Sequence, residues 1–191
     1  AFTANESYIK DDNFCGLPVV PFEKVESSYP SSEYQMFVAV GYSNLNKKRA
    51  GIFEQAKSKG YKLVSYVHPS VVVVGDFEFG ENCFVFENSV IQPFVKIGDD
   101  VIIWSGSLIS HNTTIKDHCF IASHVAIAGS STIEPYCFLG TNCTLRNGIK
   151  IAKDCVIGAG CVILEDTKEK EVFVTRSTAI PNFNRDLLKD I

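Results

Sequence analysis

Apolar residues recur at every sixth position over about half of the chain. Counting by six from Val73 to Ile163 meets an aliphatic or aromatic side chain at all sixteen positions. These residues are Val73, Phe79, Val85, Ile91, Ile97, Ile103, Ile109, Ile115, Ile121, Ile127, Ile133, Leu139, Leu145, Ile151, Ile157 and Ile163. The residue four places after each is mostly small or β-branched. A period of six residues is typical of a parallel β-helix.

The geometry of a β-helix explains this period. Each hexad forms one short strand and one corner, and three hexads close a triangular coil of eighteen residues. Residues eighteen apart then stack about 4.8 Å apart, so slightly more than five coils make a prism roughly 25 Å tall. The first position fills the prism axis, and the small fifth position lets the chain turn inward. The pattern therefore predicts a mainly β fold whose open ends need capping.

A strand–helix–strand pattern precedes the repeat. Residues 34–41 and 61–69 are each predicted to form a strand. The helix between them is predicted to have Ser43 or Asn44 as its N-cap and to end at Gly60. This arrangement indicates a βαβ unit.

The repeat divides the chain into three parts. Residues 1–66 are predicted to form a small α/β domain, in which a loop at 10–20 leads into a short strand. Residues 67–167 form the β-helix. Residues 168–191 no longer follow the six-residue period and are predicted to form a strand at 172–174, a tail and a last helical turn.

Composition excludes several classes of function. The 191 residues are 46% hydrophobic and 21% charged, with a net charge of −4, as expected for a soluble domain with a smaller companion. No basic stretch followed by an apolar one marks a signal peptide, and no apolar run is long enough to span a membrane. The mildly acidic balance favours neither nucleic acid nor a membrane as partner. We therefore expect a cytoplasmic protein.

The cysteines follow the repeat. Six of the seven are separated by 36, 18, 6, 12 and 6 residues, every interval a multiple of six. Disulfides and zinc sites do not require this spacing, whereas a repeated small packing position does. We therefore expect packing residues in a reducing compartment, and no exposed cysteine nucleophile.

The chain resembles a known family along nearly its whole length. The resemblance is carried by the stretches ISHNTTIKDHCFI, VAIAGSSTI and FVAVGYSNLNKKRAGIFEQAKSKGYKLVSYVHPS. They are similar to the left-handed β-helix sugar N-acetyltransferases, and among them to the PglD/NeuD-like group. The resemblance implies a left-handed β-helix, acetyl-CoA as co-substrate, no metal, and a UDP- or dTDP-linked amino sugar as acceptor. It also implies a homotrimer with active sites between subunits.

Two departures from the family affect the acceptor. Relatives begin with a strand and a glycine-rich loop of the GxSGHG kind, whereas this chain opens at AFTANESYIKDD, which resembles a point past that loop. The Rossmann-like domain therefore looks incomplete. Relatives also tend to carry GxPA after the last strand, where this chain has TRSTAIP.

The resemblance assigns catalytic roles to three residues. His111 aligns with the family's catalytic histidine, and a base with a pKa near 7 suits deprotonation of an attacking amine. Asn112 takes the place of the carboxylate that orients the imidazole in many relatives. Gly129 lies one coil after His111 and matches the glycine whose N–H faces the acetyl carbonyl, a contact worth roughly 3 kcal/mol.

Other candidates have weaker support. Phe120 stands where relatives often have a coenzyme-contacting histidine. His118 and His124 are expected at exposed corners on successive faces. His68 precedes Pro69 at the domain junction and is expected to be structural, with acceptor binding alongside Asn44 as its functional alternative.

The phosphates of acetyl-CoA need cations. The last coils and the tail supply them, whereas between Ile97 and Leu145 the only Lys or Arg is Lys116. The expected coenzyme-binding residues are Arg146, Lys150, Lys153 and Lys168, with Lys170 and Arg176 as further candidates. A solvated basic rim is the alternative.

Other functions remain open at this point. A zinc site of the γ-carbonic anhydrase type needs two histidines in an HxxxxH arrangement, and this chain has wider spacings. The predicted reaction is transfer of acetyl from acetyl-CoA to the amine of a nucleotide-linked amino-deoxy sugar, by direct attack with His111 as base. O-acetylation of a sialic acid or glycan is one alternative. A catalytically inactive structural β-helix is another.

Overall fold

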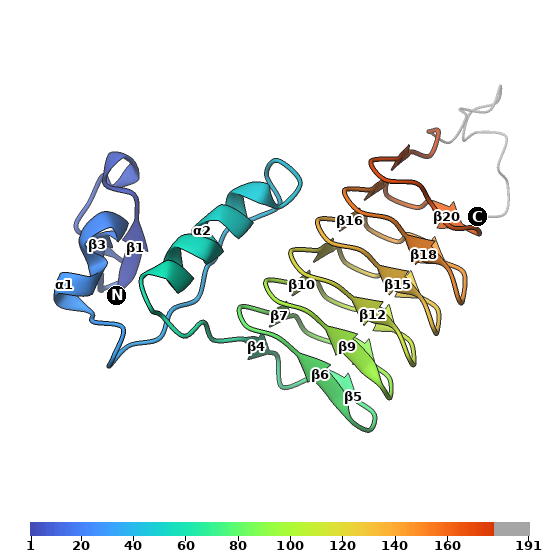
Figure 1. Ribbon diagram of the computed structural model, residues 1–191, viewed down its shortest axis with the longest axis horizontal. Coiled ribbons are helices and arrows are strands. Elements are labelled where there is room, and N and C mark those ends of the chain that lie inside the picture. Colours follow the sequence, from blue (N-terminus) through green and yellow to red (C-terminus); the bar gives the residue numbers. More distant parts are fainter. Residues whose placement is uncertain (178–191) are drawn as a thin grey trace, which may run out of the picture.

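The computed structural model describes residues 1–177. A small N-terminal unit lies beside the first coils of a long triangular β-helix. Its longest helix, α2 (Lys47–Ser58), lies between the rest of the unit and the β-helix (Figure 1). The expected last helical turn lies outside the described residues, as does most of the C-terminal tail.

The β-helix has three faces, each a parallel sheet. The first face contains β4 (Tyr66–Val67), β7 (Phe84–Val85), β10 (Ile102–Ile103), β13 (Phe120–Ile121), β16 (Phe138–Leu139), β19 (Val156–Ile157) and β21 (Val172–Phe173). The second face contains β5 (Val72–Val73), β8 (Val90–Ile91), β11 (Leu108–Ile109), β14 (Ala126–Ile127), β17 (Thr144–Leu145) and β20 (Val162–Ile163). The third face contains β6 (Phe77–Phe79), β9 (Val95–Ile97), β12 (Thr114–Ile115), β15 (Thr132–Ile133) and β18 (Lys150–Ile151).

The eighteen-residue register is confirmed. Ile103 pairs with Ile121 on the first face, and Ile109 pairs with Ile127 on the second. These first-position side chains are 0% exposed, so they form the axis of the prism. Strand β21 extends the first face past the end of the period, as the sequence predicts for residues 172–174.

From Asn82 to Gly160, the fourth position of each hexad turns the corner in the left-handed backbone region. Asn112, His118 and His124 have φ of 58°, 59° and 57°. Residues other than glycine and asparagine adopt this region at some cost, so the corner geometry constrains which side chains it carries. The corners form three edges, which we name the first–second, second–third and third–first edges after the faces they join.

The N-terminal unit contains a three-stranded sheet and four helical segments. Strand β3 (Leu17–Pro21) pairs in parallel with β1 (Phe2–Ala4) and antiparallel with β2 (Asn13–Phe14). The helical segments are η1 (Glu6–Tyr8), η2 (Phe22–Lys24), α1 (Val25–Ser28) and α2 (Lys47–Ser58). Residues 10–20, expected to be a loop leading into a short strand, instead contain β2 and most of β3, and β1 was not expected.

The βαβ pattern is present only in reduced form. The strand expected at 34–41 is a single parallel bridge from Met36 to Leu63. The second strand, expected at 61–69, is divided, because Leu63 belongs to that bridge and Tyr66 already begins the β-helix. Gly60 follows the helix with φ of 86°, as predicted.

The predicted N-cap is wrong. Helix α2 begins at Lys47, and the residue before it is Asn46, with φ of 64° and no side-chain capping bond. The Asn46 side chain instead donates to the Cys137 carbonyl oxygen at 3.2 Å and accepts from Arg49. A contact to the β-helix has replaced the local cap that sequence rules favour.

A buried polar cluster joins α2 to the β-helix. Arg49 and Asp100 are 0% exposed, and Arg49 Nε donates to Asp100 Oδ1 at 3.0 Å. Arg49 Nη2 donates to the carbonyl oxygens of Asp100 and Cys119. Asn82 and His118 bind the two carboxylate oxygens of Asp100, at 2.8 and 2.9 Å. A buried charge pair with this many hydrogen bonds fixes the register between the two parts.

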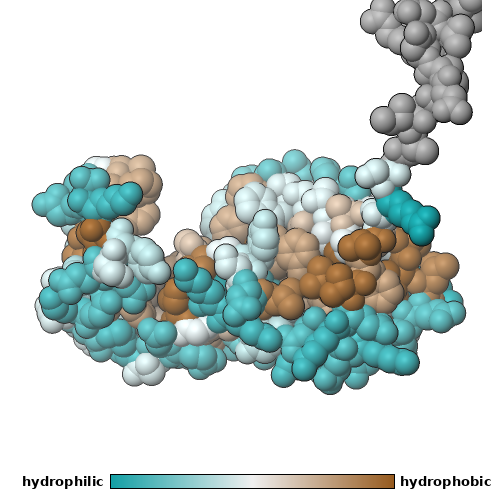
Figure 2. Space-filling view, turned by 90° about the horizontal axis from the view of Figure 1, so that it is seen from above, coloured by the Kyte–Doolittle hydropathy of each residue, from teal (hydrophilic) through white to brown (hydrophobic). Residues whose placement is uncertain are grey.

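The outward surfaces of the three faces differ. The first face carries aromatic rings that the N-terminal segment partly covers, with Tyr42 lying 4.9 Å from Phe120 between ring centroids. The second face is apolar and uncovered within residues 1–177, with Val72 52% and Val162 62% exposed. The third face is polar, and Lys96 pairs with Glu78 there. Figure 2 shows apolar surface running along the β-helix beside a polar flank. No helix within residues 1–177 is long and apolar enough to cross a membrane.

Candidate active site

His111 lies on the second–third edge, directly after β11. Its Nδ1 lies 3.0 Å from Asn112 Oδ1, and an amide oxygen only accepts, so Nδ1 carries the hydrogen. The imidazole tautomer is therefore set, and the Nε2 lone pair is left for an incoming proton. Asn112 occupies the position expected of an orienting residue.

Gln92 also holds His111, and sequence reasoning missed it. Its side-chain oxygen accepts the His111 backbone N–H at 3.0 Å from the preceding coil. Gln92 is the second residue of its hexad and lies on the same edge. Its spacing of nineteen residues from His111, one coil plus one residue, could have predicted this contact.

Gly129 lies under the imidazole, one coil after His111. A Cβ built on Gly129 would be 2.6 Å from His111 Cε1 and 2.7 Å from Nε2, so any larger residue would displace the ring. The equivalent amides of Glu81, Asp99 and His111 donate to side chains of the neighbouring coil. Within residues 1–177, no such bond uses the Gly129 amide. A ring nitrogen and a free N–H thus lie together at one edge.

His118 is buried, which contradicts the exposed corner expected for it. It is 8% exposed, its Nδ1 contacts Asp100 Oδ2, and its ring stacks on Tyr136 with centroids 4.9 Å apart. Helix α2 covers it through Phe53. Its role is to join the two parts of the molecule, and the sequence period alone does not show which corners the N-terminal unit covers.

The three clustered histidines lie on three different edges. His111 follows the second face, His118 follows the third and His124 follows the first. His124 is exposed and lies over Gly106. Because the three histidines are seven and six residues apart along the prism, each lies on a different edge and their side chains do not meet. Within residues 1–177, no group of three side chains that could hold a metal ion forms.

The remaining predicted contacts lie away from His111. Phe120 is 6% exposed on the first face, where its ring packs against Phe138 and Tyr42. His68 Nδ1 lies 2.9 Å from Ser70 Oγ on the first–second edge. Asn44 is exposed in the left-handed turn before α2. Phe120 therefore packs inside this subunit, and the structure does not bring these residues together around His111.

The basic residues do not form one cluster. Arg146 lies on the second–third edge, two coils after Ser110, which directly precedes His111. Lys150 lies on the third face, 3.1 Å from Glu134. Lys153 lies on the third–first edge over the Tyr136 ring, and residues 167–170 run beside it. Of these cations, Arg146 shares the edge of His111.

The cysteines of the repeat are packing residues, as predicted. Burial raises the pKa of the Cys83 thiol to about 11 and that of Cys143 to about 12, which keeps both protonated. Cys15, the one cysteine outside the repeat, is exposed. It lies in the turn between β2 and β3 of the N-terminal unit, apart from the edge of His111.

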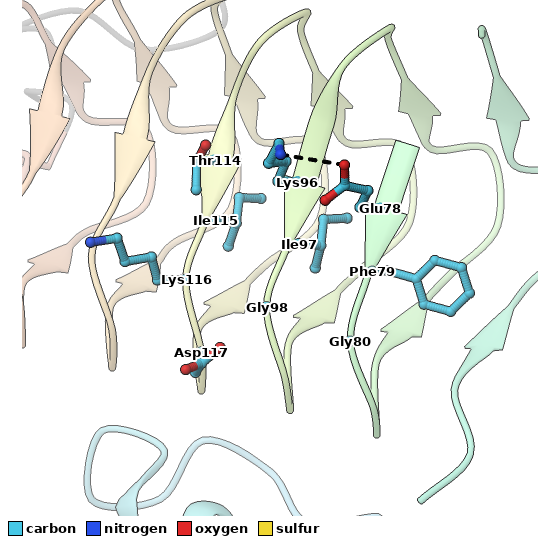
Figure 3. A pocket seen from close by; sticks show the side chains of 10 residues that line it. All are labelled: Glu78, Phe79, Gly80, Lys96, Ile97, Gly98, Thr114, Ile115, Lys116 and Asp117. Atoms are coloured by element: carbon cyan, nitrogen blue, oxygen red, sulfur yellow. Dashed lines mark ion pairs between the residues drawn. The ribbon is translucent and has the colours of Figure 1, made fainter. Parts of the chain in front are cut away.

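Two hollows lie outside this edge. One of about 380 Å³ lies on the third face, where Lys96 pairs with Glu78 and Phe79 points away from the other side chains (Figure 3). The other, of about 690 Å³, lies in the N-terminal unit between residues 1–5 and 34–40. Tyr8, Tyr29 and Lys48 also line it.

Comparison with known proteins agrees with the fold. The family model for the bacterial transferase hexapeptide (six repeats) matches residues 78–111 and 130–165. No curated protein sequence matches the chain.

Several solved structures are similar. A histidine-to-asparagine variant of perosamine N-acetyltransferase from Caulobacter crescentus, in complex with CoA and GDP-perosamine, is 28% identical with a TM-score of 0.77. The match covers 82% of this chain and 74% of that one. The acetyltransferase domain of PglB from Neisseria gonorrhoeae, with acetyl coenzyme A, is 24% identical with a TM-score of 0.78, over 86% and 79% of the two chains. The repeat match and these likenesses show that the chain has hexapeptide repeats and the β-helix fold of the sugar acetyltransferases.

Proposed function

We propose that this protein transfers acetyl from acetyl-CoA to the amine of a nucleotide-linked amino-deoxy sugar, with His111 as general base. The observation that carries the proposal is the pairing of His111 Nε2 with the free Gly129 amide at one edge. The similarity to an enzyme solved with CoA and GDP-perosamine supports the substrate class.

The chemistry follows from that pairing. Nε2 accepts a proton from the sugar amine as the amine attacks the thioester carbon. The carbonyl oxygen gains negative charge and is stabilised by the Gly129 N–H. The proton that His111 holds is then available to the leaving thiolate of CoA. Asn112 keeps the imidazole in the required tautomer but, being neutral, adds no charge to stabilise the imidazolium.

An acetyl-transfer assay tests this function. Purified protein, acetyl-CoA and a panel of UDP-, dTDP- and GDP-linked amino sugars should release CoA with at least one acceptor and give an N-acetylated product by mass spectrometry. Product that carries acetyl on a hydroxyl group would favour O-acetylation. No turnover with any acceptor would favour a structural subunit.

The uncovered second face supports a trimer. Its outward side chains are Val72, Val90, Leu108, Ala126, Thr144 and Val162, none of them charged. Uncovered apolar surface along one face of a prism suits a closed three-fold assembly with that face toward the axis. The second–third edge of one subunit then lies against the first–second edge of the next.

We expect sedimentation equilibrium to give three times the chain mass, 21.1 kDa. Replacing Leu108 with Lys should dissociate the assembly, because it places three charges near the axis. Lys96→Glu on the polar third face is the matched control and should leave the mass unchanged. A stable, active monomer would contradict the trimer.

The same trimer arrangement favours two of the expected phosphate-binding cations, Arg146 and Arg176. Arg146 lies on the second–third edge, and Arg176 lies past β21 on the first–second edge of the adjacent subunit. Both therefore border the groove that the coenzyme would follow beyond Gly129. Charge-assisted contacts to phosphate are made equally in the ground and transition states.

We therefore expect the double variant Arg146→Ala/Arg176→Ala to raise KM for acetyl-CoA about tenfold or more while kcat stays nearly constant. Lys153→Ala, on the outer third–first edge, is the control. An unchanged KM in the double variant, with dephospho-CoA bound as tightly as CoA, would refute these contacts.

A further inference from the structure

An aromatic column stands on the first–second edge. His68, Phe86 and Trp104 are eighteen residues apart and occupy the same hexad position in three successive coils. The centroids of Phe86 and Trp104 are 5.2 Å apart, and those of His68 and Phe86 are 6.2 Å apart. Trp104 is 39% exposed although it is the only tryptophan of the chain. The column ends there, because the next coil has Ala122 at this position.

Polar groups border the column on one side. Glu87 and Ser105 follow Phe86 and Trp104 directly, and Ser105 Oγ donates to Glu87 Oε1 at 2.8 Å. Both residues are half-buried. Aromatic rings beside a carboxylate and a hydroxyl form a surface suited to a ligand with an apolar face and hydrogen-bonding groups.

In the proposed trimer, the first–second edge lies against an edge of the neighbouring subunit. With the second face toward a three-fold axis, each first–second edge meets the second–third edge of a neighbour. Trp104 and His111 belong to the same coil, so rotation about an axis along the prism keeps them at the same height. The edge that carries Trp104 then faces the edge that carries His111 of the adjacent subunit.

We propose that Trp104 and Phe86 form an acceptor wall in trans, against which the sugar ring packs while its amine faces His111 of the neighbouring subunit. This inference rests on the proposed function and names the wall of that same site. One face of a deoxy sugar presents C–H groups to the indole, and the Glu87 carboxylate can accept a hydrogen bond from the amine. The wall contacts only the acceptor, so its removal should change KM for the acceptor and not KM for acetyl-CoA.

The first test is kinetic. Trp104→Ala should raise KM for the amino sugar about tenfold and leave KM for acetyl-CoA unchanged, whereas Trp104→Phe should restore most of the affinity. Phe79→Ala, another exposed aromatic-to-alanine change, is the control and should change neither KM. Sedimentation of each variant checks that the trimer persists.

The second test separates trans from cis. Differently tagged His111→Ala and Trp104→Ala subunits are coexpressed and the mixed trimers isolated. Each mixed trimer contains one interface at which a native His111 faces a native Trp104. At low acceptor concentration its rate should therefore exceed that of either parent trimer.

The outcomes are distinct. A mixed trimer no faster than the Trp104→Ala parent would mean that Trp104 does not act on a neighbour's site. An unchanged acceptor KM in Trp104→Ala would overturn the wall altogether, while wild-type turnover still upheld the proposed function. Failure of the wild-type protein with every acceptor would instead remove the proposed function itself.

Discussion

Replacing His111 with Ala is expected to lower kcat by roughly 10²- to 10⁴-fold, the range for losing a general base. Its ring is exposed at an edge and contacts Asn112 and Gly129, so little of the fold depends on it. The thermal midpoint should therefore shift by no more than a few degrees. Steady-state kinetics with a verified acceptor and a thermal melt together check both expectations.

Lys153→Ala is the control, because Lys153 is exposed but lies on the outer third–first edge, away from the proposed groove between subunits. A full rate in His111→Ala would show that the base lies elsewhere. Asn112→Ala should lower kcat less, since the imidazole remains and only its orientation is lost.

Arg49→Met is expected to destabilise the protein by about 3–5 kcal/mol, the cost of leaving a buried charge without its partner. Asp100 would keep Asn82 and His118 but lose the guanidinium that contacts both its carboxylate and its carbonyl oxygen. Urea unfolding monitored by far-UV circular dichroism measures the change. The N-terminal unit should loosen first, because this cluster joins it to the β-helix.

Lys57→Met on the same helix is the control. Lys57 pairs with Glu81 at the surface, where an ion pair contributes about 0–1 kcal/mol. The double variant Arg49→Met/Asp100→Leu should lose less stability than Arg49→Met, because it removes both charges together. Equal losses in Arg49→Met and Lys57→Met would show that the buried pair does not hold the two parts together.

The hexapeptide period predicted most of the β-helix, because a strict spatial repeat of eighteen residues converts sequence distance into position. That is how the sequence alone placed Gly129 next to His111. The period also identified the buried cysteines, since they share the fifth position with the buried small and β-branched residues of the repeat.

The period could not predict what the N-terminal unit covers. His118 and His124 occupy equivalent corners, yet only His118 is buried, because α2 docks at its edge through Arg49. The start of α2 was missed for the same reason. Asn46 makes a long-range hydrogen bond in place of a local cap, and propensity rules describe only local structure.

The buried thiols have a practical consequence for labelling. Cys83, Cys119 and Cys137 each donate to a carbonyl oxygen fifteen residues later, as the hydroxyls of Ser89 and Ser107 do. Thiol reagents act on accessible thiolates, so they should modify the folded chain at Cys15 and spare the repeat. A fluorophore attached there, with no cysteine removed, would follow the N-terminal unit as an acceptor binds.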